Sequence, residues 1–184
     1  MDAIGLTFVL AGSALIMVLS WRSLRHPRSH GFYRFFAFEA ILFIVALNAR
    51  VWFREPLGPW QIASWFLLTV SLVLAVQGFH LLHRRGHPRA PEAGSPMFPI
   101  ENTAALVTTG AYRLLRHPLY ASLLYLAWGA ALKSLTPVTV LSGVVATLAL
   151  WATAKSEEAE NIRRFGQPYR EYMARTRRFI PFVL

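Results

Sequence analysis

Long apolar runs, separated by short polar segments, make up most of the chain. Five of these runs come close to the ~20 residues that a helix needs to cross a bilayer; they cover residues 4–20, 35–53, 62–82, 118–135 and 137–154. A segment that crosses lipid on its own forms a helix, because a helix satisfies all the hydrogen-bonding groups of its own backbone. The pattern therefore predicts an all-α integral membrane bundle of about five transmembrane helices.

The thirty residues that follow the fifth run have a different pattern. Apolar and aromatic side chains recur there at three- and four-residue spacing, with arginines between them; they are Ile162, Phe165, Tyr169 and Tyr172. Gly166 and Pro168 interrupt this segment, so we expect the fifth helix to continue beyond its apolar run and to break there. The spacing favours a cytoplasmic C-terminal interfacial helix, anchored on the membrane surface.

Composition agrees with a membrane protein. Of the 184 residues, 55% are hydrophobic and only 15% are charged, which is too apolar for an ordinary soluble domain. We expect residues 1–184 to form a single membrane domain, with three spans in 1–82, a cytoplasmic loop in 83–109 and a cofactor-binding hairpin and tail in 110–184. Cysteine is absent, which excludes disulfides and thiolate ligands, and we expect no metal site.

The net charge of +10 is distributed in clusters between the apolar runs. Because these clusters do not form one continuous basic face, we expect anionic lipid headgroups rather than nucleic acid as partners. Arginines are frequent in the first and third connections and in the tail, whereas the second and fourth connections contain few basic residues. The positive-inside rule then places the N-terminus outside and the C-terminus in the cytoplasm.

The fourth and fifth runs are joined so closely that they must form an antiparallel hairpin, which turns near Pro137. His117 and Glu157 lie twenty residues to either side of this turn. Since both helices rise equally per residue, the two side chains should return to the same depth. Counting along the chain therefore predicts that His117 and Glu157 meet at the cytoplasmic membrane surface.

Polar residues in the other spans fall in the same half of the bundle. Ionisable groups in spans usually face the bundle interior or a polar cavity, so Glu39 is expected either at a site or paired with an arginine such as Arg34. Gln77 and His80 are expected to form interhelical hydrogen bonds. Glu39 and His80, together with Arg178 of the tail, are candidate substrate-binding residues. The proline-rich loop 84–109 is long enough to be functional or disordered, and it could cover a site.

Two blocks of sequence carry a family resemblance. The first is the string Gly110-Ala111-Tyr112-Arg113-Leu114-Leu115-Arg116-His117-Pro118-Leu119-Tyr120. The second comprises Glu157-Glu158, Phe165-Gly166, Tyr169, Tyr172 and Arg178-Phe179-Ile180-Pro181. Together they resemble the GxYxxxRHPxY signature and the C-terminal pattern of the isoprenylcysteine carboxyl methyltransferase and phospholipid methyltransferase superfamily. The resemblance covers residues 106–181, and Ser122 and Asn161 depart from the family pattern.

The resemblance implies an integral membrane methyltransferase that uses S-adenosylmethionine. It implies that the cofactor is bound by Gly110, Tyr112, Arg116, His117, Pro118, Tyr120, Glu157 and Glu158. Of these, Arg116, His117 and Glu157 are the candidate catalytic residues. Arg116 would grip the cofactor carboxylate, a glutamate would accept hydrogen bonds from the ribose or amino group, and a tyrosine ring would pack on adenine or on the sulfonium.

The expected acceptor is a lipophilic small molecule, either a phospholipid amine headgroup or another small lipid. An isoprenylcysteine-type carboxyl group is the alternative acceptor. The chain resembles the short members of the superfamily, which are typical of prokaryotes, so the expected location is a prokaryotic inner membrane. Two other interpretations remain open: a sterol-type reductase that uses NADPH, and a membrane scaffold or lipid sensor without catalytic activity.

The sequence does not distinguish the roles of the two adjacent glutamates. Successive helical residues point ~100° apart, so Glu157 and Glu158 cannot both face one pocket fully. One is expected to serve the cofactor, and the other to pair with an arginine. Glu160 is expected to form exposed pairs with Arg163 and Arg164, which follow it at helical spacing.

Overall fold

The computed structural model of the chain describes residues 3–27, 29–88 and 102–181, and within these ranges it is helical, without a strand. Its elements are α1 (Ala3–Leu24), α2 (His30–Asn48), η1 (Ala49–Val51), α3 (Pro59–Arg85), η3 (Gly110–Arg113), α4 (Pro118–Ala131), α5 (Pro137–Phe165) and α6 (Gln167–Arg175). Helices α1, α2, α3 and α5 contain segments that are long and apolar enough to cross a membrane. The predicted all-α membrane bundle is confirmed.

The fourth predicted span is shorter than its apolar run. Helix α4 ends at Ala131, and Lys133 and Ser134 continue in a tight turn whose N–H groups bond to Ala130 and Ala131. Its 14 residues extend only ~21 Å, less than the ~30 Å hydrocarbon core. Nine of these residues are buried, because α2, α3 and α5 pack around the helix. Since α4 is enclosed by protein, its length does not have to match the bilayer.

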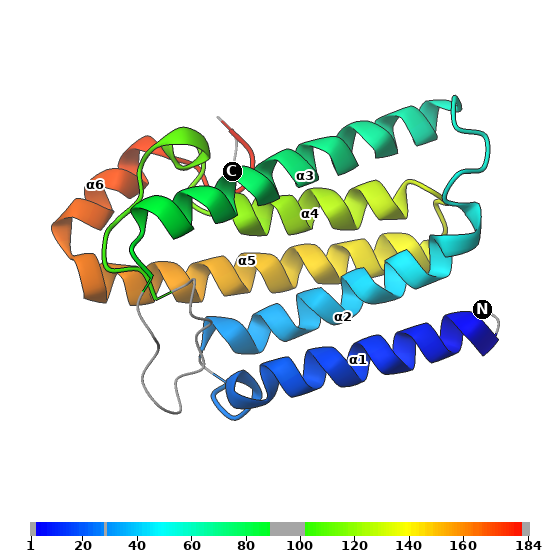
Figure 1. Cartoon of the computed structure of the whole chain (residues 1–184), viewed down its shortest axis with the longest axis horizontal. Helices are drawn as coiled ribbons and strands as arrows, with labels where there is room; N and C mark the ends of the chain where they lie inside the picture. The colour runs from blue at the N-terminus through cyan, green and yellow to red at the C-terminus, as the bar shows by residue number, and fades with distance from the viewer. Residues whose placement is uncertain (1–2, 28, 89–101, 182–184) are drawn as a thin grey trace.

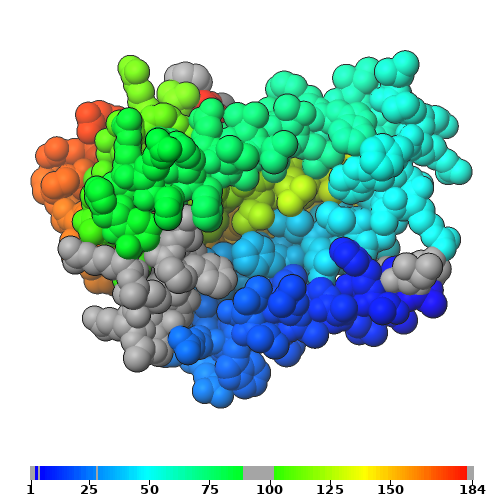
Figure 2. Space-filling view, viewed as in Figure 1, coloured from blue at the N-terminus to red at the C-terminus, as the bar shows by residue number. Residues whose placement is uncertain are grey.

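The long helices lie side by side in the order α1, α2, α5, α4 and α3, with α6 at one end (Figure 1). In the space-filling view, α4 is visible only as a narrow strip between α3 and α2 (Figure 2). The interior between α2, α4 and α5 is rich in small side chains: Ala37, Ala121, Ala127, Ala130, Ala131, Ala146 and Ala154. These alanines let the helix backbones approach closely, whereas many large apolar side chains of α1, α3 and α5 face outward.

Hydroxyl groups join α3 to α4 inside this apolar bundle. Ser64 Oγ donates to the carbonyl of Gly129 at 2.6 Å, and Ser71 Oγ donates to the carbonyl of Ser122 at 2.7 Å. Such interhelical hydrogen bonds add to van der Waals packing where lipid surrounds the bundle. They place the start of α4, which carries the His-Pro motif, at a defined position beside α3.

Helix α5 connects the two ends of the bundle. It begins at a capping box, in which Thr136 and Thr139 exchange side-chain and backbone hydrogen bonds, with Pro137 at the first helical position. It continues eleven residues beyond the predicted apolar run and ends at Gly166. Gly166 adopts φ 63° and ψ −133°, a region that favours glycine. The predicted continuation and break of this helix are both confirmed.

Candidate active site

The segment before α4 is paired with the C-terminal tail. Gly110 has φ 61°, and a Cβ at this position would lie 2.6 Å from Leu81 Cδ1, so glycine suits both the backbone and the space here. Further along, the N–H of Arg177 donates to the carbonyl of Leu114, and the N–H groups of Arg116 and His117 donate to the carbonyls of Arg177 and Arg178. These backbone bonds hold the two sequence blocks together.

Glu158 is the centre of a buried charge cluster. It is 3% exposed, and its Oε1 accepts a hydrogen bond from Arg116 Nε at 2.8 Å. Arg178 donates to the other carboxylate oxygen through Nη2 at 2.7 Å, and this pairing raises the pKa of Arg178 above its usual value. Two cations thus compensate one buried carboxylate, which offsets the cost of removing it from water.

The expected grip of Arg116 on a cofactor carboxylate does not match its contacts. Besides Glu158, the guanidinium donates through Nη1 to the backbone carbonyls of Met173 and Thr176. Arg116 therefore fastens the tail to the start of α4, while its side chain also forms part of a cavity wall. The question of which glutamate pairs with an arginine is answered: it is Glu158.

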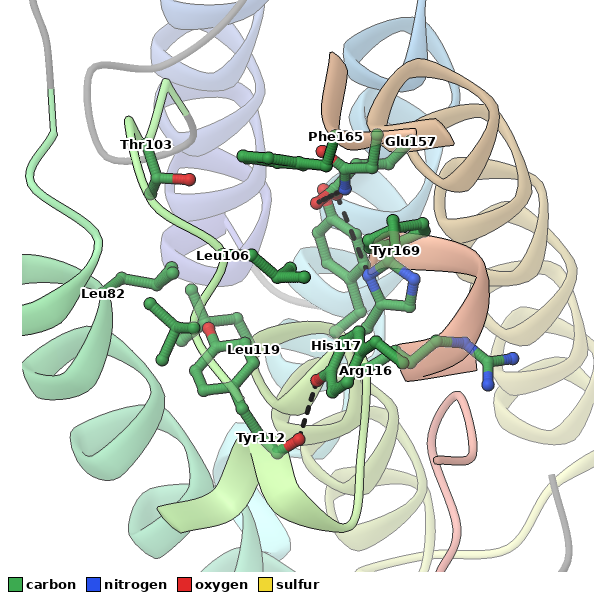
Figure 3. Close-up of a pocket in the computed structure, with 14 residues that line it drawn as sticks. Leu82, Thr103, Leu106, Tyr112, Arg116, His117, Leu119, Glu157, Phe165 and Tyr169 are labelled. Atoms are coloured by element: carbon green, nitrogen blue, oxygen red, sulfur yellow. Dashed lines mark hydrogen bonds and ion pairs between the residues drawn. The ribbon is translucent and has the colours of Figure 1, made fainter. Parts of the chain in front are cut away.

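A polar cavity of about 100 Å³ lies beside this cluster. It is bounded by the end of α3, the segment after the loop, the start of α4, α5 and α6 (Figure 3). Its walls are formed by Leu82, Thr103, Leu106, Val107, Tyr112, Arg116, His117, Leu119, Tyr120, Glu157, Asn161, Phe165, Tyr169 and Tyr172. The cavity is smaller than the ~300–1,000 Å³ of typical ligand pockets, so a nucleoside-sized ligand requires its walls to move apart.

Glu157 and His117 meet in this cavity, as the depth argument predicted. His117 Nδ1 lies 3.9 Å from Glu157 Oε2, and the Glu157 side chain is 24% exposed. His117 Nε2 is buried and lies 3.4 Å from Glu158 Oε1, but it forms no hydrogen bond with the described residues. The cavity therefore offers a partly accessible carboxylate and a buried imidazole nitrogen.

Helix α2 contributes an arginine and a histidine near Glu157, which the sequence did not reveal. The side chains of Arg34 and His30 lie close enough to interact electrostatically with the Glu157 carboxylate. His30 is 1% exposed, and its Nδ1 lies 2.8 Å from Glu160 Oε2. The expectation that Glu160 pairs with Arg163 and Arg164 was wrong, because this carboxylate faces α2. No local pattern distinguishes His30 from the other histidines in the sequence.

The aromatic face of α6 packs against the protein rather than outward. Tyr169 and Tyr172 are both buried, and Tyr172 Oη donates to the carbonyls of Tyr112 at 2.7 Å and Leu115 at 3.2 Å. Burial raises the pKa of both phenols above their usual range, so Tyr172 remains a donor at neutral pH. The preference for simple membrane anchoring was wrong for these two side chains, which close the cavity instead.

Replacing Tyr172 with phenylalanine is expected to lower the free energy of unfolding by about 1–3 kcal/mol, because the substitution leaves buried carbonyl acceptors without their donor. Thermal unfolding of the detergent-purified protein measures the loss. Tyr125→Phe is the control, since the Tyr125 hydroxyl makes no hydrogen bond with the described residues. Equal stability of the two variants would contradict the assigned role of Tyr172.

Several predicted residues lie outside the cavity. Glu39 accepts a hydrogen bond from Ser13 Oγ at 2.6 Å, between α1 and α2, instead of facing a site. Gln77 and His80 are exposed on α3 and do not form the expected interhelical bonds within the described part of the chain. Both side chains therefore lie on the outer surface of α3, away from the helices that pack against it. Glu39 and His80 therefore lie away from the candidate site.

Gly110, Pro118, Glu158 and Arg178 do not line the polar cavity, although Arg178 lines a neighbouring groove. Pro118 occupies the first position of α4, where its missing N–H is not needed. We expected that the loop 84–109 could cover a site. The described end of this loop does so, because Thr103, Leu106 and Val107 form one wall of the cavity. Ala104 N–H fixes this wall by donating to the carbonyl of Gly86 at 2.8 Å. Residues 89–101 of the loop lie outside the described residues.

A second, larger cavity lies on the other side of Arg116. This groove of about 780 Å³ lies between α3, α4, α5 and the tail. It is lined by Leu67, Arg116, Leu124, Tyr125, Trp128, Thr147, Leu148, Trp151, Arg177, Arg178, Phe179 and Ile180. Most of its lining is apolar, and two of its arginines, Arg116 and Arg178, donate to Glu158. Arg116 is shared by the groove and the polar cavity.

Comparison with known proteins agrees with the resemblance. A family model described as phospholipid methyltransferase matches residues 59–167. A probable protein-S-isoprenylcysteine O-methyltransferase from Oryza sativa subsp. indica is 31% identical over 125 residues, which cover 65% of this chain and 63% of the relative. Methanethiol S-methyltransferase from Pseudomonas deceptionensis is 26% identical over 178 residues, which cover 95% of this chain and 58% of the relative.

The chain spans less than two thirds of the length of these relatives. The mouse protein-S-isoprenylcysteine O-methyltransferase is 33% identical over 86 residues, which is 45% of this chain and 29% of the relative. No solved structure matches the chain at a comparable level of significance. The matched region of the family model includes the whole of α3, α4 and α5, and the motif segment between α3 and α4.

Proposed function

Because the chain belongs to the phospholipid methyltransferase family, we propose that it is a membrane-embedded methyltransferase that uses S-adenosylmethionine and methylates a lipophilic acceptor. The observation that carries the proposal is the position of Glu157. Its carboxylate enters a polar cavity at the point where the His-Pro segment, the long helix and the C-terminal tail converge. One wall of that cavity is shared with a wide apolar groove.

The residues around the polar cavity suit this cofactor. Glu157 supplies negative charge for an ammonium or sulfonium group, and Asn161 Nδ2 lies 3.5 Å from its Oε1. His117 Nε2 lies 3.4 Å from Glu158 Oε1 but forms no hydrogen bond with the described residues, so it offers a buried hydrogen-bonding position. The rings of Tyr112, Tyr120 and Tyr169 offer aromatic faces. When bound, S-adenosylmethionine supplies an electrophilic methyl group on a positively charged sulfur.

The protein contributes position and environment to such a transfer. In-line displacement gains most from holding the acceptor atom in line with the methyl carbon. Arg116 and Glu158 fix the wall between the polar cavity and the groove, while Tyr169, Tyr172 and Leu106 exclude bulk water from the polar side. A carboxylate or thiolate acceptor needs no base. For an amine acceptor, Glu157 or His117 would receive the proton.

The groove favours a lipophilic acceptor. Its apolar walls suit a hydrocarbon chain, and the arginines in its lining suit an acidic or polar headgroup. The expected acceptors are a phospholipid amine or another small lipid, with an isoprenylcysteine-type carboxyl group as the alternative. The clusters of arginines predict that the site faces the cytoplasm. The resemblance to short members of the superfamily, which are typical of prokaryotes, implies a prokaryotic inner membrane.

Calorimetric titration of the detergent-purified protein tests the proposal. We expect S-adenosylmethionine and S-adenosylhomocysteine to bind to the wild-type protein, and NADPH to produce no saturable heat. Binding of NADPH alone would support the sterol-type reductase instead. If none of the three ligands binds, even with lipid present, the methyltransferase proposal is wrong and a non-catalytic scaffold is favoured. Screening lipids for transfer of a radiolabelled methyl group then identifies the acceptor class.

A further inference from the structure

A third cavity lies at the opposite end of the bundle from α6, where the α2–α3 connection meets the α4–α5 turn (Figure 1). Its volume is about 270 Å³, larger than the polar cavity beside Glu157. Arg54 and Glu55 line it from the α2–α3 connection, Trp60 lines it from the start of α3, and Lys133 and Leu135 line it from the α4–α5 turn. The proposed methyl transfer uses none of these residues, so this cavity requires its own explanation.

Lys133 is the unusual residue in this cavity. It is 5% exposed, and its Nζ donates to Gln61 Oε1 at 2.9 Å, while Gln61 Nε2 donates back to the Lys133 carbonyl at 3.3 Å. The ammonium lies 3.4 Å from the ring centre of Trp65 and 5.3 Å from that of Trp52. This clamp of one amide and two indoles holds the amine in a defined position.

The partners of Lys133 do not neutralise its charge. An amide and aromatic rings supply partial negative charge only, and no carboxylate of the described residues lies within 4.0 Å of Nζ. Burial accordingly lowers the pKa of Lys133 below its usual value. A buried ammonium without a counter-ion is costly, so an anion that enters the adjoining cavity would be stabilised there.

The other charged groups around the cavity set the charge of its ligand. Arg54 adds a second cation, and Glu55 adds one carboxylate, which leaves one positive charge to be balanced. Glu55 adopts φ 47°, a left-handed conformation that is uncommon for a residue with a side chain. The Gly58 N–H, which donates to the Glu55 carbonyl at 2.9 Å, holds this turn in place. Such strained residues often occur at ligand sites.

The rim of the cavity indicates the source of the anion. Trp60 is 63% exposed and Leu135 is 43% exposed, and both line the cavity together with Arg54 and Lys133. Exposed tryptophan beside apolar side chains is typical of the membrane interface. We propose that this cavity binds the phosphodiester of a membrane lipid headgroup, with Lys133 and Arg54 as its cationic partners. The site is separate from the proposed methyltransferase site.

Titration with dihexanoyl-phosphatidylglycerol tests the site, with the protein delipidated in a non-ionic detergent. We expect saturable binding by the wild-type protein and a loss of affinity of about tenfold or more in Lys133→Met and in Arg54→Gln, because each removes a charged hydrogen-bond donor. Lys155→Met is the matched control. It removes the other lysine of the chain, which is exposed and stacks near Trp151, so its affinity should equal that of the wild type.

Two further titrations, with inorganic phosphate and with dihexanoylglycerol, identify the ligand. Inorganic phosphate should bind much more weakly than the lipid, and uncharged dihexanoylglycerol should not bind to the Lys133 site. Unchanged lipid affinity in both Lys133→Met and Arg54→Gln overturns the proposal. Equal affinity for inorganic phosphate and lipid overturns the lipid assignment. If Lys133→Met fails to fold, Arg54→Gln decides the result, because Arg54 is exposed and its substitution should leave the fold intact.

Discussion

Replacing Glu158 with alanine should lower the free energy of unfolding by about 3–5 kcal/mol, because removing one partner leaves buried charge uncompensated. Glu158 is 3% exposed, and Arg116 and Arg178 both donate to it. Without the carboxylate, the Arg116 guanidinium loses its counter-ion. Chemical unfolding in detergent, followed by circular dichroism, measures the change. The same variant should lose cofactor binding, since the cluster fastens the tail that closes the cavity.

Glu171→Ala is the control for this substitution. Glu171 is an exposed glutamate of α6, and its carboxylate lies 3.4 Å from Gln167 Nε2 across one helical turn. Exposed interactions of this kind contribute little, so the change should stay within about 0.5 kcal/mol. If Glu158→Ala is as stable as Glu171→Ala, then the charge cluster does not hold the tail, and the explanation given for Arg116 is incorrect.

Replacing Glu157 with glutamine should weaken the binding of S-adenosylmethionine by about 10- to 100-fold with little loss of stability. The substitution keeps the size of the side chain but removes its charge, and hydrogen bonds to charged groups contribute about 1.5–3 kcal/mol. The side chain is 24% exposed and lies in the cavity wall, so the fold does not depend on it as it does on Glu158. Calorimetric titration measures the affinity, and thermal unfolding confirms the fold.

Glu160→Gln provides the matched control on the same helix. Its carboxylate faces His30 of α2 instead of the cavity, so cofactor affinity should remain within about twofold of the wild type. Comparing the affinities for S-adenosylmethionine and S-adenosylhomocysteine shows which part of the cofactor Glu157 contacts. A larger loss for S-adenosylmethionine than for S-adenosylhomocysteine indicates the sulfonium, and an equal loss indicates the part that both molecules share. Unchanged affinity in Glu157→Gln would remove Glu157 from the site.

The roles of the two adjacent glutamates could not be predicted from the sequence. Helical geometry required Glu157 and Glu158 to face different directions, and the family resemblance implied that both bind the cofactor. It did not say which one meets the ligand, because that depends on where the arginines of other segments lie. The tail supplies Arg178, and the start of α4 supplies Arg116. Because both arginines donate to Glu158, this side chain is buried among them, whereas Glu157 lines the cavity.

The sequence by itself determined the class of fold, the hairpin and the meeting of His117 with Glu157. These features follow from local quantities: the length of apolar runs, the rise per residue of a helix and the position of one turn. The break at Gly166 was equally local, because glycine and proline act on the backbone at their own positions. Each of these predictions needed only neighbours along the chain.

Only the tertiary structure decided which distant side chains share an environment. His30 pairs with Glu160 across 130 positions, Glu39 turns to Ser13, and Tyr172 bonds to carbonyls of the motif segment. The rotation of each helix about its axis determines these contacts, and that rotation is set by packing against all its neighbours at once. A long apolar helix, whose faces are similarly hydrophobic, carries little record of its rotation in its own sequence.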